Sequence, residues 1–263
     1  MFWPYDEQRQ AQILRQSVGA MFMSPMTRDR YVRAGLVSDS KAYSFTDSYP
    51  TDSHLYVKGQ SELGILSQAQ AGPDSSIRLI HALHLGMLPE WRPIEPLLAA
   101  LKGLSPVMEI DFHGYVYPEA QKAIASDPIL RRLLRCRQPV SHDESHYLAE
   151  DCDLLLVVIG PRHLDNQPSK FFEYLYHQKP FLVLGPRGNP IERLVAELGV
   201  GMYADVASRD SIESAMGDIC TNYNRFVAAF SNNRDSIAKY SDKSVAKAWC
   251  AILDKVFLDS RSR

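Results

Sequence analysis

Short apolar runs alternate with longer amphipathic segments from residue 77 onward. Residues 154–159 are apolar throughout rather than at every second position, which is typical of a strand buried on both faces of a sheet. We predict strands over residues 77–83, 107–113, 153–159, 180–184 and 201–204. We predict helices over residues 93–104, 118–134, 142–150, 168–177 and 190–198. This alternation predicts an α/β fold, a Rossmann-like parallel sheet with helices on both faces.

Local sequence signals support the predicted helix starts. Ser141 and Glu144 form a capping box, with the serine as N-cap and the glutamate reaching back from the third helical position. Asn189 precedes Pro190, which places a capping side chain directly before a proline at the first helical position. After Ser211 we expect helical structure, which closes with a helix over residues 245–257.

The first 60 residues have a different pattern. We expect a helix over residues 6–18, then an apolar run at residues 20–23, and a second helix that starts at Ser24-Pro25 and stops near residue 35. Residues 38–53 predict mostly loop, with a short strand around 42–45. This segment has too few apolar residues for a core of its own. We therefore predict a partial N-terminal segment, residues 1–60, and a Rossmann-like domain, residues 61–263.

The charge balance gives no electrostatic signature of nucleic-acid binding, because the 29 Lys and Arg and the 31 Asp and Glu residues give a net charge of -2. One local basic cluster comprises Arg131, Arg132, Arg135 and Arg137. We interpret it as the solvated face of a helix. An anion site or contact with an acidic membrane surface is the alternative.

Cysteine usage and the apolar stretches indicate a cytoplasmic protein. The four cysteines lie far apart without a CxxC pair, so we expect neither a disulfide framework nor a zinc site. The N-terminal sequence MFWPYDEQRQ lacks the basic patch and apolar run of a signal peptide. No apolar stretch approaches the roughly 20 residues of a membrane span.

The loop after the fully apolar strand carries the chemistry of a candidate binding site. In open parallel sheets, ligands bind beyond the carboxyl ends of the strands, where helix N-termini point their free N–H groups. A helix that begins at Pro168 offers the N–H groups of Ser169 to Phe171 to an anion, and Lys170 adds a positive charge. Glu173, one turn further on, is suited to accept hydrogen bonds from a ribose diol.

Sequence stretches around this loop resemble family 4-like (group 1) glycosyltransferases of the GT-B fold. Residues 141–144 with 149–156 resemble the stretch before the family's donor loop, and residues 168–175 with 179–184 resemble its donor-site helix and following strand. The resemblance covers residues 20–258 and is strongest over 140–205. It implies the C-terminal half of a GT-B fold, a nucleotide-sugar-binding domain, preceded by a remnant of the acceptor domain and the crossover.

The family's signature at this place is two acidic residues separated by seven. Asp165 and Glu173 have that spacing, with aspartate where the first glutamate is usual. The resemblance implies that Glu173 holds the donor ribose and that Asp165 is the catalytic residue, facing the sugar near the reacting carbon. It also implies that Pro168, Ser169 and Lys170 bind the nucleotide sugar.

A weaker resemblance extends to the first predicted strand and helix. Between them the family often has a glycine and a basic residue near the diphosphate. Ala82 stands at the expected glycine position, and Gly86 and Arg92 are the substitutes nearby. We therefore add Gly86 and Arg92 to the predicted nucleotide-sugar-binding residues.

The implied activity is hexosyl-type transfer from a nucleotide-diphosphate sugar to a glycan or other glycoconjugate acceptor, with retention, as in polysaccharide biosynthesis. We expect no metal and no cofactor, because helix N–H groups and basic side chains neutralise the leaving diphosphate. The family's acceptor domain cannot be placed in the sequence, so a protein partner that supplies it is one expectation, as is peripheral contact with the inner membrane face. The alternative is a non-catalytic GT-B-like binding or regulatory module, or a truncated, inactive enzyme.

Histidines leave two questions open. His142 and His146 are spaced for a shared helical face, but the capping box explains this segment without a metal, so we predict no metal site. His81 and His84 flank the end of the first strand, and each either faces the donor pocket or has a structural role. A phosphoacceptor receiver domain also fits the alternation, but residues 80–84 contain no carboxylate.

Overall fold

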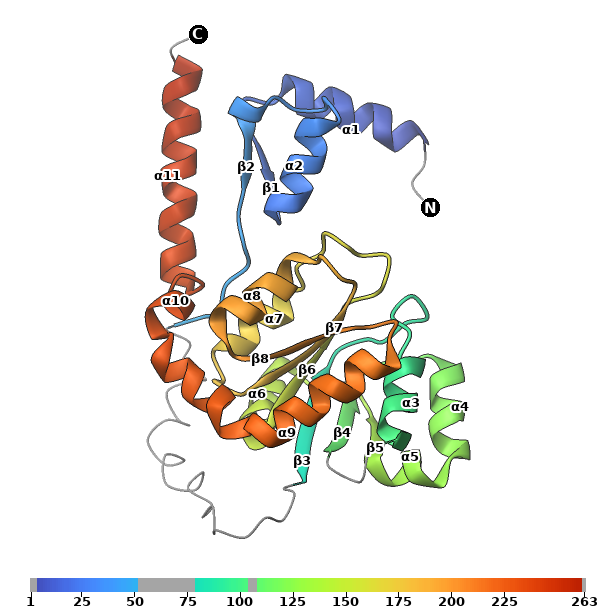
Figure 1. Ribbon diagram of the computed structural model, residues 1–263. Helices are drawn as coiled ribbons and strands as arrows, with labels where there is room; N and C mark the ends of the chain where they lie inside the picture. Colours follow the sequence, from blue (N-terminus) through green and yellow to red (C-terminus); the bar gives the residue numbers. More distant parts are fainter. Residues whose placement is uncertain (1–3, 52–78, 104–107, 262–263) are drawn as a thin grey trace.

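A computed structural model describes residues 4–51, 79–103 and 108–261. Its main feature is a sheet of six parallel strands in the order β5-β4-β3-β6-β7-β8 (Figure 1). The strands are β3 (Ile80–Leu85), β4 (Met108–His113), β5 (Leu134–Arg137), β6 (Leu154–Val158), β7 (Phe181–Gly185) and β8 (Gly201–Asp205). The predicted α/β fold with a parallel sheet is confirmed. Positions 77, 78, 104 and 107 of the predicted elements lie outside the described residues.

The strand order reverses between β3 and β6, the two central strands. From β3 the chain proceeds outward to β4 and β5, and from β6 it proceeds in the opposite direction to β7 and β8. In the register, Leu83 of β3 lies between Asp111 of β4 and Leu155 of β6. Open α/β sheets bind ligands beyond the carboxyl ends of the strands at such a reversal. The topology therefore predicts a site at the carboxyl ends of β3 and β6.

Helices cover both faces of this sheet (Figure 1). One face is covered by α3 (Glu95–Gly103), α4 (Pro118–Ser126), α5 (Pro128–Leu133) and α9 (Arg209–Asn232). The other is covered by α6 (His142–Asp151), α7 (Ser169–Leu175) and α8 (Pro190–Leu198). The even-numbered residues of β6 join the first core and the odd-numbered residues join the second. Each fully buried aliphatic side chain contributes about 1.5–3 kcal/mol, which explains why β6 is apolar throughout.

Two predicted helix starts are confirmed in detail. The amide of Glu144 donates to Ser141 Oγ at 3.3 Å, and the amide of Ser141 donates to Glu144 Oε2 at 2.9 Å, so the capping box is present. Asn189 Oδ1 accepts from the amide of Ile191 at 2.9 Å and caps α8, which has the predicted bounds. The C-terminal part is helical as expected, in α9, α10 (Arg234–Ala238) and α11 (Asp242–Arg261).

The single helix predicted over residues 118–134 is instead two helices, α4 and α5, with a break at Asp127. Asp127 ends α4 and caps α5, because its carboxylate accepts from the amides of Ile129 and Leu130 and Pro128 has no N–H to continue the first helix. From Leu134 the chain forms β5, an edge strand that the sequence analysis missed.

The interpretation of the basic cluster as a helix face is therefore wrong for Arg135 and Arg137, which lie on β5. Arg135 forms an ion pair with Glu109 of β4, and Arg137 Nε lies 3.9 Å from Asp111 Oδ2. The sheet edge thus carries a row of charge pairs between neighbouring strands, which stabilises their register.

The N-terminal residues form a small layer that is separate from the large sheet. It contains α1 (Pro4–Gln16), β1 (Ala20–Phe22), α2 (Pro25–Arg33) and β2 (Ala42–Ser44), and the two strands pair in parallel. The predicted short strand at 42–45 and both helices are confirmed, whereas β1 was described only as an apolar run. Its core holds just four buried residues: Ala20, Phe22, Val37 and Ala42.

The last helix, α11, leaves the large sheet and runs alongside β2 (Figure 1). The rings of Trp249 and Phe45 meet edge to face with centroids 4.7 Å apart, and Lys255 Nζ lies 5.6 Å from the centroid of Tyr43. We call residues 4–45 together with α11 the small unit, and residues 79–103 with 108–240 the sheet unit. The chain crosses between them at Tyr49 and Ser241, which form a bridge.

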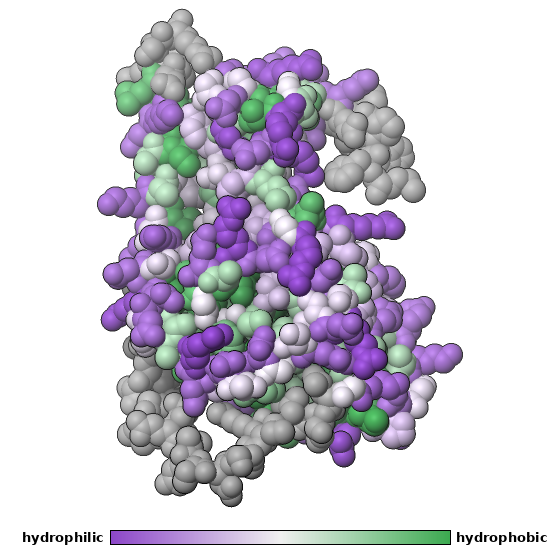
Figure 2. Space-filling model, viewed as in Figure 1, coloured by the Kyte–Doolittle hydropathy of each residue, from purple (hydrophilic) through white to green (hydrophobic). Residues whose placement is uncertain are grey.

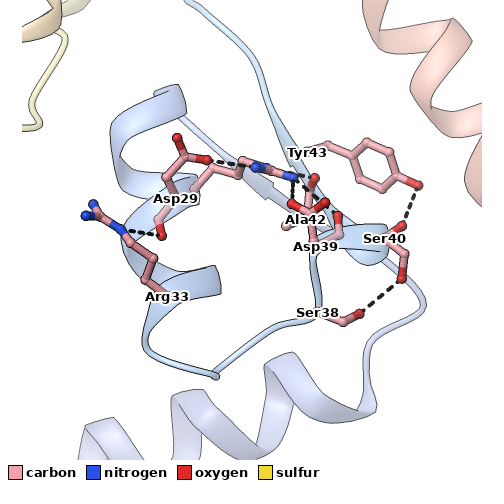
Figure 3. A network of polar contacts seen from close by, with 8 residues as sticks. Asp29, Arg33, Ser38, Asp39, Ser40, Ala42 and Tyr43 are labelled. Carbon is pink, nitrogen blue, oxygen red and sulfur yellow. Dashed lines mark hydrogen bonds and ion pairs between the residues drawn. The ribbon is translucent and has the colours of Figure 1, made fainter.

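Arg28 anchors α2 within the small unit through contacts with Asp29, Asp39 and Ala42, which are labelled in Figure 3. Its guanidinium donates to Asp29 Oδ1 at 2.7 Å, to the carbonyl oxygens of Ala42 and Asp39 at 3.2 and 3.3 Å, and to the carboxylate of Asp39. Since Ala42 belongs to β2, one side chain joins the helix, the strand and the turn between them. On the same helix, Arg33 donates only to the carbonyl of Asp29, at 3.2 Å.

Hydrophilic side chains predominate on the face of the molecule seen in Figure 2, and hydrophobic ones form small separate patches there. Within the described residues, no helix is both long and apolar enough to cross a membrane.

Candidate functional site

A cavity of about 380 Å³ opens at the carboxyl ends of β3 and β6, where the strand order reverses. This volume lies within the usual range for small-molecule sites. Its walls come from the end of β3 and the following loop, from β6, from the loop leading into α7, and from the small unit. The residues that line it are Met23, Asp47, His84, Leu85, Gly86, Arg92, Leu156, Val157, Val158, Asn166, Gln167, Pro168, Ser169, Lys170 and Tyr174.

Two cations and one carboxylate are among these lining residues. Arg92 Nη1 donates to the carbonyl of Met87 at 3.2 Å, its Nε has no hydrogen-bond partner among the described residues, and burial lowers its pKa. Lys170 Nζ lies 2.7 Å from Glu173 Oε2. Asp47 is the lining carboxylate, and it comes from the crossover segment. The excess positive charge at a partly buried site favours an anionic ligand.

Gly86 makes the turn at the carboxyl end of β3. Its φ of +131° lies in the region that favours glycine, and its amide donates to the carbonyl of His113 at 2.9 Å. Ala82, the expected glycine position, instead lies within β3, where it is buried between Ile110 and Leu154. The predicted strand ended at residue 83, but β3 continues to Leu85, so the turn after it falls at Gly86 and not at Ala82.

His84 is the histidine that lines the cavity. It is 5% exposed, its Nδ1 lies 3.0 Å from the carbonyl oxygen of Leu156, and burial lowers its pKa to about 4. The ring is therefore neutral at pH 7, Nδ1 carries the proton that it donates to Leu156, and Nε2 is left as an acceptor. His81 lies elsewhere, with Nε2 3.5 Å from Asp111 Oδ2.

The two acids of the predicted signature are not among the lining residues. Glu173 lies one turn into α7 and is held by Lys170. Asp165 Oδ2 lies 2.9 Å from Arg30 Nη1 and accepts from Thr27 Oγ1 at 3.2 Å, so it faces α2 of the small unit. Of the predicted site residues, the structure brings together five around the cavity: Gly86, Arg92, Pro168, Ser169 and Lys170.

Sequence reasoning missed three features of the donor loop. Asn166 and Gln167 line the cavity, and Gln167 is buried with an Oε1 that has no partner among the described residues. The side-chain Nδ2 of Asn189 donates to three carbonyl oxygens of this loop, those of His163, Leu164 and Asn166, at 3.2, 3.0 and 2.9 Å. In the sequence, Asn189 before Pro190 indicates only the start of a helix. The contacts of Asn189 with the loop cannot be read from the sequence, because they depend on tertiary structure.

His146 of α6 lies near His177, which follows α7. His146 Nδ1 lies 3.1 Å from His177 Nε2, and burial together with His146 lowers the pKa of His177 to about 3. Among the described residues, no group of three or more His, Cys, Asp or Glu is arranged to hold a metal ion.

No protein-family model and no curated protein sequence matches the chain. Solved structures do match its fold. HepE of Anabaena in complex with UDP has a TM-score of 0.70 and 13% identity, over 96% of this chain and 68% of HepE. Sucrose-phosphate synthase of Thermosynechococcus elongatus has a TM-score of 0.68 and 14% identity, over 97% and 63%. WaaG, a glycosyltransferase involved in lipopolysaccharide biosynthesis, has a TM-score of 0.61 and 13% identity, over 88% and 61%.

These neighbours are GT-B glycosyltransferases. The chain therefore has the fold of that class, as the sequence resemblance implied: a six-stranded parallel sheet flanked by helices, like a Rossmann-like domain of a GT-B enzyme. It spans about two thirds of the length of these three proteins. At such identities the likeness establishes the fold, and activity has to be argued from the site.

Proposed function

We propose that the chain binds a nucleotide-diphosphate sugar in the cavity between β3 and β6, where the strand order reverses, and serves as the donor-binding part of a glycosyltransferase. The observation that carries this proposal is the pair of cationic side chains, Arg92 and Lys170, in a cavity of about 380 Å³ at the carboxyl ends of β3 and β6. Solved structures of HepE, which has the same fold, are complexes with UDP and with UDP-glucose, and this supports the choice of ligand.

The diphosphate would lie between the turn at Gly86 and the first turn of α7. Arg92 has an unpartnered Nε there, and Lys170 would exchange its contact with Glu173 for a phosphate oxygen. Glu173, once released, would be free to accept from the ribose hydroxyls. Charge-assisted contacts of this kind stabilise a departing diphosphate, so the reaction that we propose, with retention and a hexosyl-type donor, proceeds without a metal or cofactor.

The acceptor in this proposal is a glycan or other glycoconjugate, as in polysaccharide biosynthesis. The cavity opens against the small unit, which contributes Met23 to its lining, and against the crossover segment, which contributes Asp47. We propose that the acceptor approaches from that side, on a surface completed by an acceptor-domain protein partner, and that the protein acts in the cytoplasm or at the inner membrane face.

A second candidate function is a non-catalytic module that binds a nucleotide sugar for regulation. The position of Asp165 favours it, because the residue that the resemblance assigns to catalysis is bound to Arg30 and Thr27 and does not line the cavity. The two functions share the donor site and differ in turnover.

Calorimetric titration with UDP, GDP, ADP and their glucose conjugates tests the shared part. We expect dissociation constants in the micromolar to millimolar range for one nucleotide series. Arg92→Ala should weaken that binding roughly tenfold to a hundredfold, because a charge-assisted hydrogen bond contributes about 1.5–3 kcal/mol. Arg132→Ala, an exposed arginine of α5, is the matched control and should leave the affinity unchanged.

Failure of the folded wild-type protein to bind any of these nucleotides would overturn the donor-site proposal. If a nucleotide binds, a second measurement distinguishes the transferase from the regulatory module: whether the protein releases the nucleoside diphosphate from the nucleotide sugar. Slow hydrolysis of the conjugate in the absence of an acceptor supports the transferase. Binding without any release over hours, with or without added glycans, favours the regulatory module.

A further inference from the structure

We propose that Asp165 is a positioning residue: it fastens the donor loop, residues 160–168, to α2 of the small unit, and through this clamp Arg30 controls the shape of the donor cavity. This inference rests on the proposed donor site. It replaces the sugar-facing role that the family resemblance implied for Asp165.

The contacts of Asp165 carry the inference. Its Oδ2 lies 2.9 Å from Arg30 Nη1 and accepts from Thr27 Oγ1 at 3.2 Å, while its carbonyl oxygen accepts from Ser24 Oγ at 3.1 Å. Ser24 is fully buried, and its Oγ also caps α2 by accepting from the amide of Thr27 at 3.0 Å. Both the side chain and the backbone of Asp165 are therefore bound to the first turns of one helix.

Each end of this clamp is itself fixed. Arg28 ties α2 to β2 and the preceding turn (Figure 3). On the other side, Asn189, which is 2% exposed, binds three carbonyl oxygens of the loop. The loop is thus held from the sheet unit by Asn189, and from the small unit by the contacts of Thr27 and Arg30 with Asp165.

The clamp adjoins the cavity directly. Asn166 and Gln167 follow Asp165 in the chain and line the cavity, although Asp165 does not. The amide of Asn166 donates to the carbonyl of His163 at 3.2 Å, a hydrogen bond that closes the turn in the loop. If Asp165 moves away from α2, the two lining side chains move with it, because they share its backbone. The donor site then depends on Arg30, which does not line the cavity.

Hydrogen exchange of the ligand-free protein tests the clamp without any donor. We expect Arg30→Ala and Asp165→Asn to accelerate amide exchange in residues 163–167, and Arg33→Ala, one turn further along α2, to leave it unchanged. Arg30→Lys should restore most of the protection, because it keeps the charge. Asp165→Asn is nearly isosteric, and circular dichroism verifies that each variant is folded.

Donor titration is the second readout. Arg30→Ala and Asp165→Asn should each weaken nucleotide-sugar binding by about threefold to fivefold, as expected for a partly exposed ion pair. The double variant should be no worse than either single variant, because both remove the same contact. The charge-swapped pair Arg30→Asp with Asp165→Arg should recover part of the loss.

Unchanged loop exchange and unchanged donor affinity in Arg30→Ala, together with abolished sugar release in Asp165→Asn, would overturn the clamp and return Asp165 to the sugar. If the wild-type protein binds no nucleotide sugar, the proposed function fails. The exchange comparison between Arg30→Ala and Arg33→Ala then decides by itself whether Asp165 positions the loop.

Discussion

The sheet unit and the small unit are stabilised by different kinds of interaction. The sheet unit has two extensive apolar cores, one on each face of a six-stranded sheet. The small unit has two short strands, a core of four buried residues and a polar network around Arg28. Burial of apolar surface is non-directional and insensitive to salt, whereas exposed ion pairs are weak and screened.

This difference bears on the cavity, because its walls come from both units. The sheet unit, with its extensive cores, supplies Arg92 and Lys170. The less extensively packed small unit supplies Met23, and the crossover segment that follows β2 supplies Asp47. We therefore expect the two sides of the cavity to respond differently to mutation, pH and salt.

We expect the largest loss of stability from a substitution that leaves a void in the core of the sheet unit. Leu182 is fully buried in β7, and Leu182→Ala should lower the free energy of unfolding by about 2–5 kcal/mol, through lost burial and the void left behind. Leu14→Ala, at a half-buried position against the small core, should cost about 1 kcal/mol or less. Urea denaturation of both variants measures this, and equal costs would remove the distinction between the units.

Acid should act on the sheet unit through its buried histidines, His84 and His177, whose pKa values are lowered to about 4 and about 3. The pKa of His84 is about 4 in the folded protein against 6.5 when unfolded, so below pH 6.5 the unfolded state binds the additional proton. The contribution of this neutral ring is complete above pH 6.5 and is lost as the pH falls toward 4, by about 3 kcal/mol. His84→Asn, whose side-chain amide can still donate to Leu156, should remove that part of the dependence in denaturation curves measured from pH 7 to 4.

The small unit has no histidine in residues 4–45 or in α11, so its hydrogen-exchange protection should change less than that of the sheet unit over the same pH range. Equal losses of protection in both units would show that acid acts globally and not through His84.

Removing the contact between α11 and β2 should loosen the small unit alone. Trp249→Ala deletes the edge-to-face contact with Phe45 and a half-buried indole, at a cost of about 1–2 kcal/mol. We expect faster amide exchange in residues 20–45, while β6 and β7 keep their protection. Lys247→Ala, at an exposed position of the same helix, is the control. A uniform change in both units would mean that they unfold as one.

The smallest expected effect is that of salt. Raising the ionic strength from about 0.01 to 1 M shortens the Debye length from about 30 to 3 Å and should weaken the ion pairs of Arg28. Local protection of α2 should fall by about 0.5 kcal/mol. Exchange in β7, which is apolar throughout, should not change. A greater salt effect on β7 than on α2 would contradict the comparison.

Strong local patterns made most of the sheet unit predictable. The apolar run at 154–159 indicated a strand buried on both faces, and Asn189 with Pro190 indicated the start of α8 to the residue. The helix at 118–134 was predicted wrongly because Asp127-Pro128 was not recognised as a break, although an aspartate before a proline is a usual cap signal. The strand β5 is four residues long and contains two arginines, so its composition gives no strand signal.

The candidate site was predictable in part. Lys170 and Ser169 follow from the position of a helix start after a buried strand, and both line the cavity. The place of Asp165 could not be predicted, because its partners Thr27 and Arg30 are more than 130 residues earlier in the chain. The contribution of Asp47 was missed for the same reason, since no local pattern indicates that the crossover meets the donor loop.

The pairing of α11 with β2 also determines the order of events in folding. A Cβ on Gly19 would lie 3.1 Å from Val256, so the segment that leads into β1 packs against α11 although more than 200 residues separate them. During synthesis the sheet unit can collapse first, since all of its strands precede residue 206. The small unit can be completed only after α11 has been synthesised, because Trp249 and Lys255 of that helix pack against Phe45 and Tyr43. Until then β1 and β2 would lack the cover of α11, and exposed strands of this kind can pair with other chains.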